Sequence, residues 1–315
     1  EGNIRNAPVG GDLVFTYDNQ GPSLNFKFPY PPTALNSYST GTANSNPDWE
    51  LCRASGDVSD VGTFASGVAE VFVALSTGGP DDSLWDWWSK TSEDFTIPGS
   101  AVIQWTTQVY TGGASWQYHP ANDFNGVLED GLPYTFYIKA RDNAGNWTND
   151  VTAPSASGAS YRLQFKFDVS KPTSTLTSPA SGAPLNALTS LAGTATDVGT
   201  GAGVQAVYLA VQNTSDPLLK WWNWGTPGFS VANAPAWPTT GAQPGAAWLM
   251  VSSNNAPGTF TMFWSTTVPA AMLASSQTYR VVAGVWDWTS NKSDNPTAAG
   301  VGREFRYDTA PPVVK

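Results

Sequence analysis

The sequence predicts an all-β protein that contains two similar β-sandwich domains in tandem. The first observation is composition, because the 315 residues include 30 Gly, 24 Pro and 15 Trp while only 13% are charged. Such a chain is too aromatic for disorder and too rich in turn residues for a helical fold. The second observation is that short alternating runs between turn residues are frequent, whereas no segment keeps a 3.6-residue apolar period. The third is a stretch that occurs three times.

This repeated stretch is a short strand of alternating aromatic and polar residues, then Asp, three residues and Pro. It reads FTYDNQGPS at 15–23, FKFDVSKPTS at 165–174 and FRYDTAPPVV at 305–314. Repetition at a long period is typical of a domain array, and Pro ends strand pairing, so we interpret each copy as a joint.

The joints predict the domain boundaries. We expect one domain over residues 18–168 and a second over 169–308, with the boundary near Ser170–Pro172. Residues 1–17 are expected to be the last strand of a preceding repeat, or an N-terminal arm that adds to the sheet edge of another chain. Residues 309–315 are expected to lead to a following repeat, so the chain resembles part of a longer array.

The two domain bodies align in blocks that keep the same order, which predicts the same fold. The aligned pairs are Val71–Leu75 with Val207–Val211, Trp85–Trp88 with Trp221–Trp224, Ile103–Val109 with Met262–Val268, and Tyr134–Asp142 with Tyr279–Asp287. In the second domain we expect seven strands, near 174–178, 188–196, 204–211, 219–224, 259–266, 277–286 and 303–307. Seven short strands separated by turn signals predict a two-sheet sandwich.

The order of motifs resembles bacterial immunoglobulin-like repeats. The motifs are G-x-A-x-D and G-x-G-V within Gly193–Val204, the loop Asp142-Asn-Ala-Gly-Asn146, and Asp-Thr-Ala-Pro-Pro at 308–312. The resemblance implies tandem immunoglobulin-like domains from a large secreted or cell-surface bacterial protein, such as a long adhesin. The second domain departs from it, with Asp287-Trp-Thr-Ser-Asn291 in place of the Ala-Gly loop, and both domains exceed the usual length of about 100 residues.

Charge and rare residues exclude several classes of function. The net charge of −10 argues against nucleic acid and anionic membranes, and no apolar run is long enough for membrane insertion. The single Cys52 excludes an internal disulfide. The only histidine, His119, has no nucleophile motif beside it, and no pair of carboxylates stands out as a glycosidase pair, so we expect no enzymatic activity.

Acidic residues at loop starts are the candidate metal ligands. In an immunoglobulin-like sandwich the entering linker shares one pole with two loops, which would gather Asp168, Asp197 and Asp287. In the first domain the counterparts are Asp18, Asp57 or Asp60, and Asp142. Three carboxylates repel one another unless a cation joins them, and Ca²⁺ prefers oxygen ligands, so we predict calcium. The alternative is that each Asp only caps its own turn.

Two tryptophan clusters are the candidate binding residues. They consist of Trp85, Trp87 and Trp88 in the first domain and Trp221, Trp222 and Trp224 in the second. Adjacent strand positions face opposite sides of a sheet, so we expect at least one member of each cluster to be exposed or at a contact. Such rings would bind sugars or another chain, whereas the alternative is packing in the core and between domains.

The function predicted from the sequence is a non-enzymatic extracellular segment that spaces and stiffens a larger surface protein or fibre and contributes to adhesion. Its expected partners are other copies of the repeat and, through the tryptophans, glycans. The alternatives are a carbohydrate-binding module or an accessory region of a secreted hydrolase.

Overall fold

The fold is taken from a computed structural model and consists of strands and turns, without a helix among the residues described. Those residues are 17–29, 36–40, 50–78, 86–99, 102–105, 107–110, 112–124, 126–148, 161–180, 182, 184–198, 201–237, 245–253, 258–298 and 300–311. In this part of the chain, no segment qualifies as a helix that could cross a membrane. The predicted strand in residues 1–17 falls outside it, apart from Tyr17.

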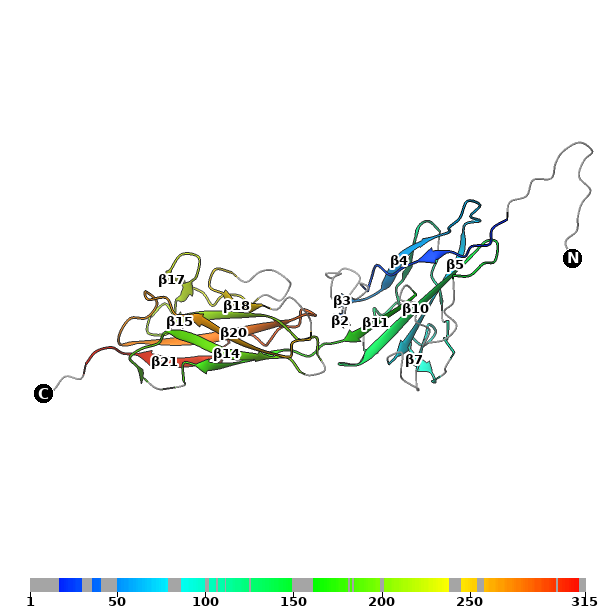
Figure 1. Cartoon of the computed structure of the whole chain (residues 1–315). Coiled ribbons are helices and arrows are strands. Elements are labelled where there is room, and N and C mark those ends of the chain that lie inside the picture. Colours follow the sequence, from blue (N-terminus) through cyan, green and yellow to red (C-terminus); the bar gives the residue numbers. More distant parts are fainter. Residues whose placement is uncertain are drawn as a thin grey trace, which may run out of the picture. The chain divides into compact units, whose positions relative to one another are not determined.

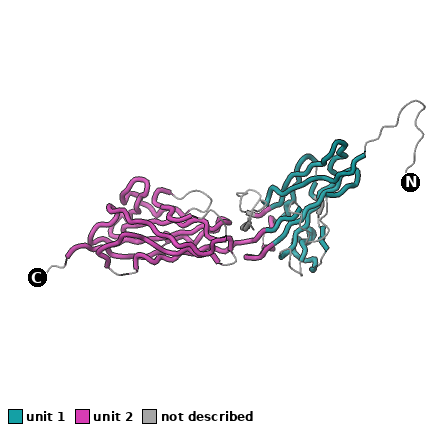
Figure 2. Tube along the Cα trace, in the orientation of Figure 1, with its two compact units in different colours: residues 1–33, 53–122, 134–164 teal, residues 34–52, 123–133, 165–315 magenta. Residues whose placement is uncertain are grey.

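The chain divides into two compact units (Figure 2). The first unit comprises residues 1–33, 53–122 and 134–164, and the second comprises residues 34–52, 123–133 and 165–315. The predicted boundary near Ser170–Pro172 stays a prediction.

The second unit is a β-sandwich (Figure 1). A three-stranded sheet has the order β12-β14-β19, and a larger sheet has the order β13-β21-β20-β15-β16-β17 with β18 beside β15. The bounds are β12 Thr173–Ser178, β13 Pro184–Leu185, β14 Ser190–Thr196, β15 Val204–Asn213, β16 Trp221–Asn223, β17 Gly228–Val231, β18 Leu249–Ser253, β19 Thr261–Thr267, β20 Gln277–Asp287 and β21 Arg303–Tyr307. All seven predicted strands are present, and the three that the sequence missed are β13, β17 and β18.

The first unit repeats this arrangement. One sheet has the order β1-β4-β9, and the other has β11-β10-β5-β6-β7 with β8 beside β5. The bounds are β1 Ser23–Leu24, β4 Ala54–Ser59, β5 Val68–Thr77, β6 Trp87–Ser89, β7 Asp94–Ile97, β8 Thr107–Gln108, β9 Ser115–Tyr118, β10 Pro133–Asp142 and β11 Arg162–Phe167. The division between the units falls within β11, whose last three residues are assigned to the second unit together with β2 (Asn36–Thr40) and β3 (Glu50–Leu51). These last residues of β11, Phe165–Phe167, pair in parallel with β2.

Apolar residues of the second unit form two clusters. The main core lies between the sheets and includes Leu191, Met262 and Trp264 of the small sheet with Val207 and Val281 of the large one. These residues alternate with half-buried ones along β14 and with exposed ones along β19, as expected for strands with one buried face.

The other cluster covers the outer face of the large sheet. There Trp237 and Trp248, from the segments that flank residues 238–244, pack with Tyr208, Trp221 and Trp286. This added layer gives a structural reason why the domain is longer than a minimal sandwich.

A glycine beneath a tryptophan marks equivalent strands in the two units. Gly193 pairs with Trp264, and Gly56 pairs with Trp116. A Cβ on Gly193 would lie 2.4 Å from the Trp264 ring, and one on Gly56 would lie 2.8 Å from Trp116 Nε1. The predicted alignment of Ile103–Val109 with Met262–Val268 is therefore wrong, because Trp116 of β9 is the counterpart of Trp264.

This close approach predicts a large effect of a small substitution. Gly193→Ala is expected to lower the free energy of unfolding by about 1–3 kcal/mol, because the added methyl group would collide with the backbone oxygen of Thr175 and with the Trp264 ring. Urea unfolding followed by circular dichroism measures the change. The matched control is Gly245→Ala, since a Cβ there meets no atom within 4 Å. Equal stability of the two variants would contradict the assignment.

The tryptophan clusters also align differently from the prediction. Trp87 pairs with Ser76 and Trp221 with Gln212, so the equivalent pairs are Trp87 with Trp221 and Trp88 with Trp222. The predicted alignment was shifted by two residues because both clusters contain several tryptophans in succession. In each unit the two adjacent indoles lie on opposite faces of the sheet.

Candidate metal centre

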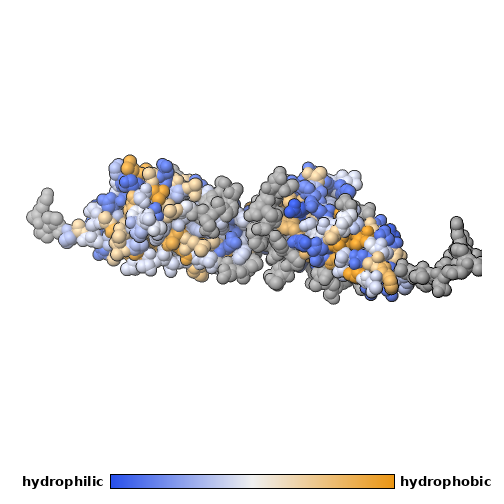
Figure 3. Space-filling view, turned by 90° about the horizontal axis from the view of Figure 1, so that it is seen from above, coloured by the Kyte–Doolittle hydropathy of each residue, from blue (hydrophilic) through white to orange (hydrophobic). Residues whose placement is uncertain are grey.

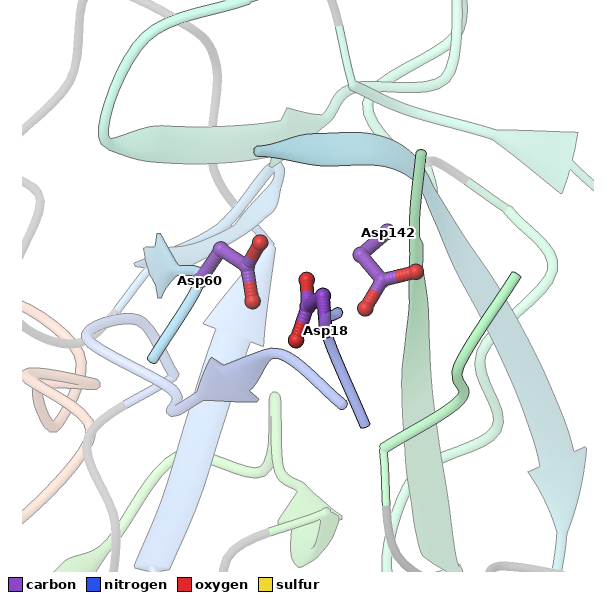
Figure 4. Close-up of side chains that lie close together, drawn as sticks. All are labelled: Asp18, Asp60 and Asp142. Atoms are coloured by element: carbon purple, nitrogen blue, oxygen red, sulfur yellow. The ribbon is translucent and has the colours of Figure 1, made fainter. Parts of the chain in front are cut away.

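Each unit gathers three aspartates from the same places in the fold. Asp168 follows β11, Asp197 follows β14 and Asp287 ends β20, and together they form the second acidic cluster. The first acidic cluster consists of Asp18, before β1, Asp60, after β4, and Asp142, at the end of β10; Figure 4 shows their carboxylates turned toward one another. In each cluster, carboxylate oxygens from the three residues lie within 4.8 Å of one another.

Asp168 ties the entering segment to two loops of the second unit. Its Oδ2 accepts hydrogen bonds from Ala202 N at 2.6 Å and from Thr289 Oγ1 at 3.3 Å. Its Oδ1 accepts one from Ser170 N at 3.0 Å. The carboxylate is fully buried, and the loops after β14 and β20 therefore close around it.

Asp197 is held in the same way by its own loop. Its Oδ1 accepts a hydrogen bond from Val198 N at 3.0 Å, and its Oδ2 accepts one from Gly203 N at 2.7 Å. These bonds fix the carboxylate at the end of β14, facing the other two aspartates of the cluster.

Asp287 is the residue whose bonding is incomplete. Its Oδ1 accepts hydrogen bonds from Thr289 N at 2.9 Å and Asn291 N at 2.8 Å, with Thr289 Oγ1 as a third donor at 3.0 Å. Its Oδ2 is buried and has no hydrogen-bond partner. A buried carboxylate oxygen without a partner is costly, so this atom requires a proton or a cation.

Burial dominates the electrostatics of the second cluster. It raises the pKa of Asp287 to about 8, and the neighbouring charge of Asp168 adds to the effect. Burial also raises the pKa of Asp168 to about 6, opposed by the Ala202 N–H and reinforced by the charge of Asp197. The pKa of Asp197 is raised mainly by burial as well. Three carboxylates at this place therefore resist holding three negative charges together.

In the first cluster, equivalent backbone N–H groups donate hydrogen bonds to the carboxylates, but the cluster is more exposed to solvent. Asp60 accepts hydrogen bonds from Val61 N at 2.9 Å and Gly67 N at 2.6 Å, as Asp197 does from Val198 and Gly203. Asp18 accepts one from Ser66 N at 2.8 Å, and the hydrogen bonds of Ser66 hold the pKa of Asp18 below its usual value. Asp18 and Asp60 are half-buried, whereas Asp142 is buried.

Two asparagines complete the clusters. Asn291 Nδ2 donates a hydrogen bond to the carbonyl oxygen of Asp168 at 3.0 Å, and Asn146 Nδ2 donates one to the carbonyl oxygen of Asp18 at 3.0 Å. Both asparagines stand four residues after the last aspartate of their cluster. This shared D-x-x-x-N spacing was the available signal, although the asparagines were not among the predicted site residues.

Of the two alternatives in the first domain, Asp60 joins the cluster and Asp57 does not. Asp57 lies within β4, and its carboxylate is 2.7 Å from Lys27 Nζ. The structure therefore does not bring Asp57 together with the other predicted ligands of the first domain. The alternation along β4 buries Gly56 and Val58, which turns the intervening Asp57 to the opposite face.

The predicted aromatic platform is not present at the adjacent indoles. Trp87, Trp88, Trp221 and Trp222 are buried, and Trp224 is half-buried against the main core. Trp85 lies outside the described residues. The expectation of a largely exposed member fails in the second cluster, because the outer face of the sheet is covered by the layer around Trp237 and Trp248.

The donor set of the acidic clusters fits a hard cation. All the candidate ligands are oxygens, which suit Ca²⁺ or Mg²⁺ rather than Zn²⁺. Two oxygens on opposite sides of a calcium ion bound at about 2.4 Å lie about 4.8 Å apart. The spacing of the carboxylates in both clusters is compatible with one shared ion of this size.

Comparisons with known proteins add no functional assignment. No protein-family model matches the sequence, and no curated protein matches it. Among solved structures, the fibronectin(III)-like modules of CbhA from Clostridium thermocellum align with a TM-score of 0.35 at 10% identity, covering 91% of this chain and 93% of that one.

Two further structures align less well. The FN1-FN3 domains of chicken CNTN1 give a TM-score of 0.31 at 8% identity, covering 87% of this chain and 63% of theirs. CBD12 from CALX1.2 gives a TM-score of 0.23 at 11% identity, covering 83% and 81%. These similarities are too low to assign a function to this chain.

Proposed function

We propose that the chain is a non-enzymatic segment of a larger bacterial extracellular protein, in which calcium fixes the segment entering each domain. The observation that carries the proposal is the duplicated acidic cluster, above all the buried, unpartnered Oδ2 of Asp287. A turn cap needs only one carboxylate with its backbone donors. Turn capping alone gives no reason for three carboxylates at one place in both units.

The role of the ion is to stiffen the segment that leads into the domain. Asp168 lies on this segment, whereas Asp197 and Asp287 lie on loops of the sandwich, so one shared ion would tie the segment to the sandwich. The same segment is also held by Asp130, whose carboxylate accepts hydrogen bonds from Val169 N at 2.8 Å and Ser170 Oγ at 2.5 Å. A chain of domains stiffened in this way would act as a spacer on a surface or in a fibre.

The turn that follows Asp308 supports the interpretation of the Asp-to-Pro stretch as a repeated joint. Its Oδ1 accepts a hydrogen bond from Ala310 N at 3.0 Å, two residues later, as Asp18 does from Gln20 N and Asp168 from Ser170 N. The third joint thus begins with the same turn as the other two. This supports the proposal that further copies of the domain follow in the parent protein.

Calcium is expected to raise the melting temperature and to reduce the range of shapes in solution. At a calcium concentration of about 100 times Kd, binding adds about 2.7 kcal/mol, which corresponds to a rise of roughly 5–10 °C for a domain of this size. Thermal unfolding and small-angle scattering with calcium, and then with EGTA, measure both effects. Magnesium is the control cation, because it keeps more of its water and binds through fewer carboxylates.

An unchanged melting temperature together with an unchanged maximum dimension would contradict this function and leave the aspartates as turn caps. The alternative of glycan binding through the predicted tryptophans is less favoured, since four of the six residues are buried.

A further inference from the structure

We propose that the outer face of the large sheet in the first unit binds a saccharide residue that carries one carboxylate, such as a hexuronic acid. The site is an aromatic-basic patch made of Phe72 on β5, Lys139 and Arg141 on β10, Trp147 in the loop after β10, and Trp105 before β8. This proposal does not depend on the acidic clusters or on calcium.

Lys139 lies among three aromatic rings. Its Nζ is 4.4 Å from the ring centroid of Trp105, 4.6 Å from that of Trp147 and 5.5 Å from that of Phe72. Burial lowers the pKa of Lys139, which reflects the water that the rings exclude. An ammonium group in such surroundings attracts an anion more strongly than one surrounded by water.

Lys139 is surrounded by the aromatic rings and by a second cation, Arg141, and the patch is partly exposed to solvent. Trp147 is 42% exposed and stands 6.0 Å from Phe72, centroid to centroid, while the guanidinium of Arg141 lies 5.5 Å from the Trp147 ring. Glu70 bonds Arg141 at 2.7 Å, so it neutralises one of the two cations. The patch therefore keeps about one positive charge in a chain whose net charge is −10.

The second unit shows what a closed version of this face looks like. Phe72 pairs with Lys139, and in the second unit Tyr208 pairs with Gly284. Gly284 lies directly beneath Trp237, since a Cβ there would be 2.3 Å from that ring. The first unit thus carries a cation between rings where the second unit carries a glycine sealed by an indole. Figure 3 shows one face of each unit, with hydrophobic residues among hydrophilic ones.

These features define the ligand by its chemistry. A pyranose presents C–H groups that stack on an indole face, and its carboxylate would meet Lys139. A single carboxylate matches the single surplus charge of the patch. Nucleic acid and anionic membranes are disfavoured by the overall charge, and a neutral sugar would leave the ammonium without its anion.

The test compares two ligands that differ only in the carboxylate. Methyl β-glucuronide and methyl β-glucoside are titrated into the full chain in the millimolar range and followed by tryptophan fluorescence and saturation-transfer NMR. The glucuronide is expected to bind about tenfold more tightly, because a charge-assisted hydrogen bond replaces a neutral one. Equal affinity of the two sugars, or no binding of the glucuronide, would overturn the proposal.

Variants place the site on the patch. Lys139→Met keeps a long apolar side chain between the rings and is expected to remove the preference for the glucuronide. Trp147→Ala is expected to weaken both sugars, and Phe263→Ala, at a ring that is 80% exposed on β19, to change neither. An unchanged melting temperature shows that each variant is folded. Full binding by Lys139→Met, or loss of binding in Phe263→Ala, would show that the site lies elsewhere.

Discussion

Replacing Trp222 by alanine is expected to destabilise the second unit by about 3–5 kcal/mol, the range for removing a large aromatic side chain from a core. Trp222 is 2% exposed and belongs to the main core between the two sheets. Its ring lies 5.2 Å from that of Phe229 and 6.5 Å from that of Trp224. Alanine at this position would remove both of these aromatic contacts and leave a cavity in the core.

Urea unfolding of the full chain, followed by circular dichroism, measures this effect. Domains of ordinary stability have about 5–15 kcal/mol to lose, so the variant is expected to fold with a much smaller margin. The control Phe263→Ala removes an exposed ring from β19 and should change the free energy of unfolding little. A loss below about 1 kcal/mol for Trp222→Ala would mean that the indole is not a core residue.

The sequence predicts the sandwich well because its strands alternate strictly where one face is buried. Buried Leu191, Gly193 and Ala195 alternate with less buried residues along β14, and the repeated Asp-to-Pro joints separate the two bodies. The layer around Trp237 was not predicted, since Trp237 lies outside any strand and Trp248 directly precedes β18, a strand that the sequence also missed. Trp221 is buried as a member of this layer, so the exposed indole expected there is absent.

The positions of residues at strand ends were easier to predict from the sequence than those of residues whose strand boundaries or alignment were ambiguous. Asp168, Asp197 and Asp287 each stand at the end of a strand, so the topology of the sandwich was enough to bring them together. The choice between Asp57 and Asp60 depended on where β4 ends, and boundaries are the least reliable part of a sequence-based prediction. The alignment of Trp105 with Trp264 failed because both are followed by hydroxyl residues, whereas the structural counterpart Trp116 is followed by Gln117.

The effect of Asp287→Asn on stability is expected to change sign when calcium is added. Without calcium, the variant should be at least as stable as the natural protein, because a neutral amide avoids the cost of burying a titratable carboxyl group at this position, to which the charge of Asp168 adds. With calcium, it should be less stable, because it lacks one anionic ligand and most of the stabilisation of about 2.7 kcal/mol expected at 100 times Kd. Melting temperatures in calcium and in EGTA measure both effects.

The pH dependence provides an independent readout of the same carboxyl group. The pKa of Asp287 in the folded chain is raised to about 8 from the ordinary value of 3.8, so the folded state holds a proton that the unfolded state has lost. Without calcium, the free energy of unfolding contributed by this group is present below the lower value and is lost as the pH rises to about 8. Asp287→Asn should flatten that decline, since an amide does not titrate in this range.

The control is Asp294→Asn, which removes one negative charge from the same unit at a side chain that is 87% exposed and paired with Lys171. An exposed pair contributes little, so this variant should keep both the calcium shift and the pH slope. If Asp287→Asn keeps a full calcium shift, the ion does not bind at Asp287, and the unpartnered oxygen needs another explanation. If both variants lose the shift equally, calcium acts through net charge rather than through a site built by Asp168, Asp197 and Asp287.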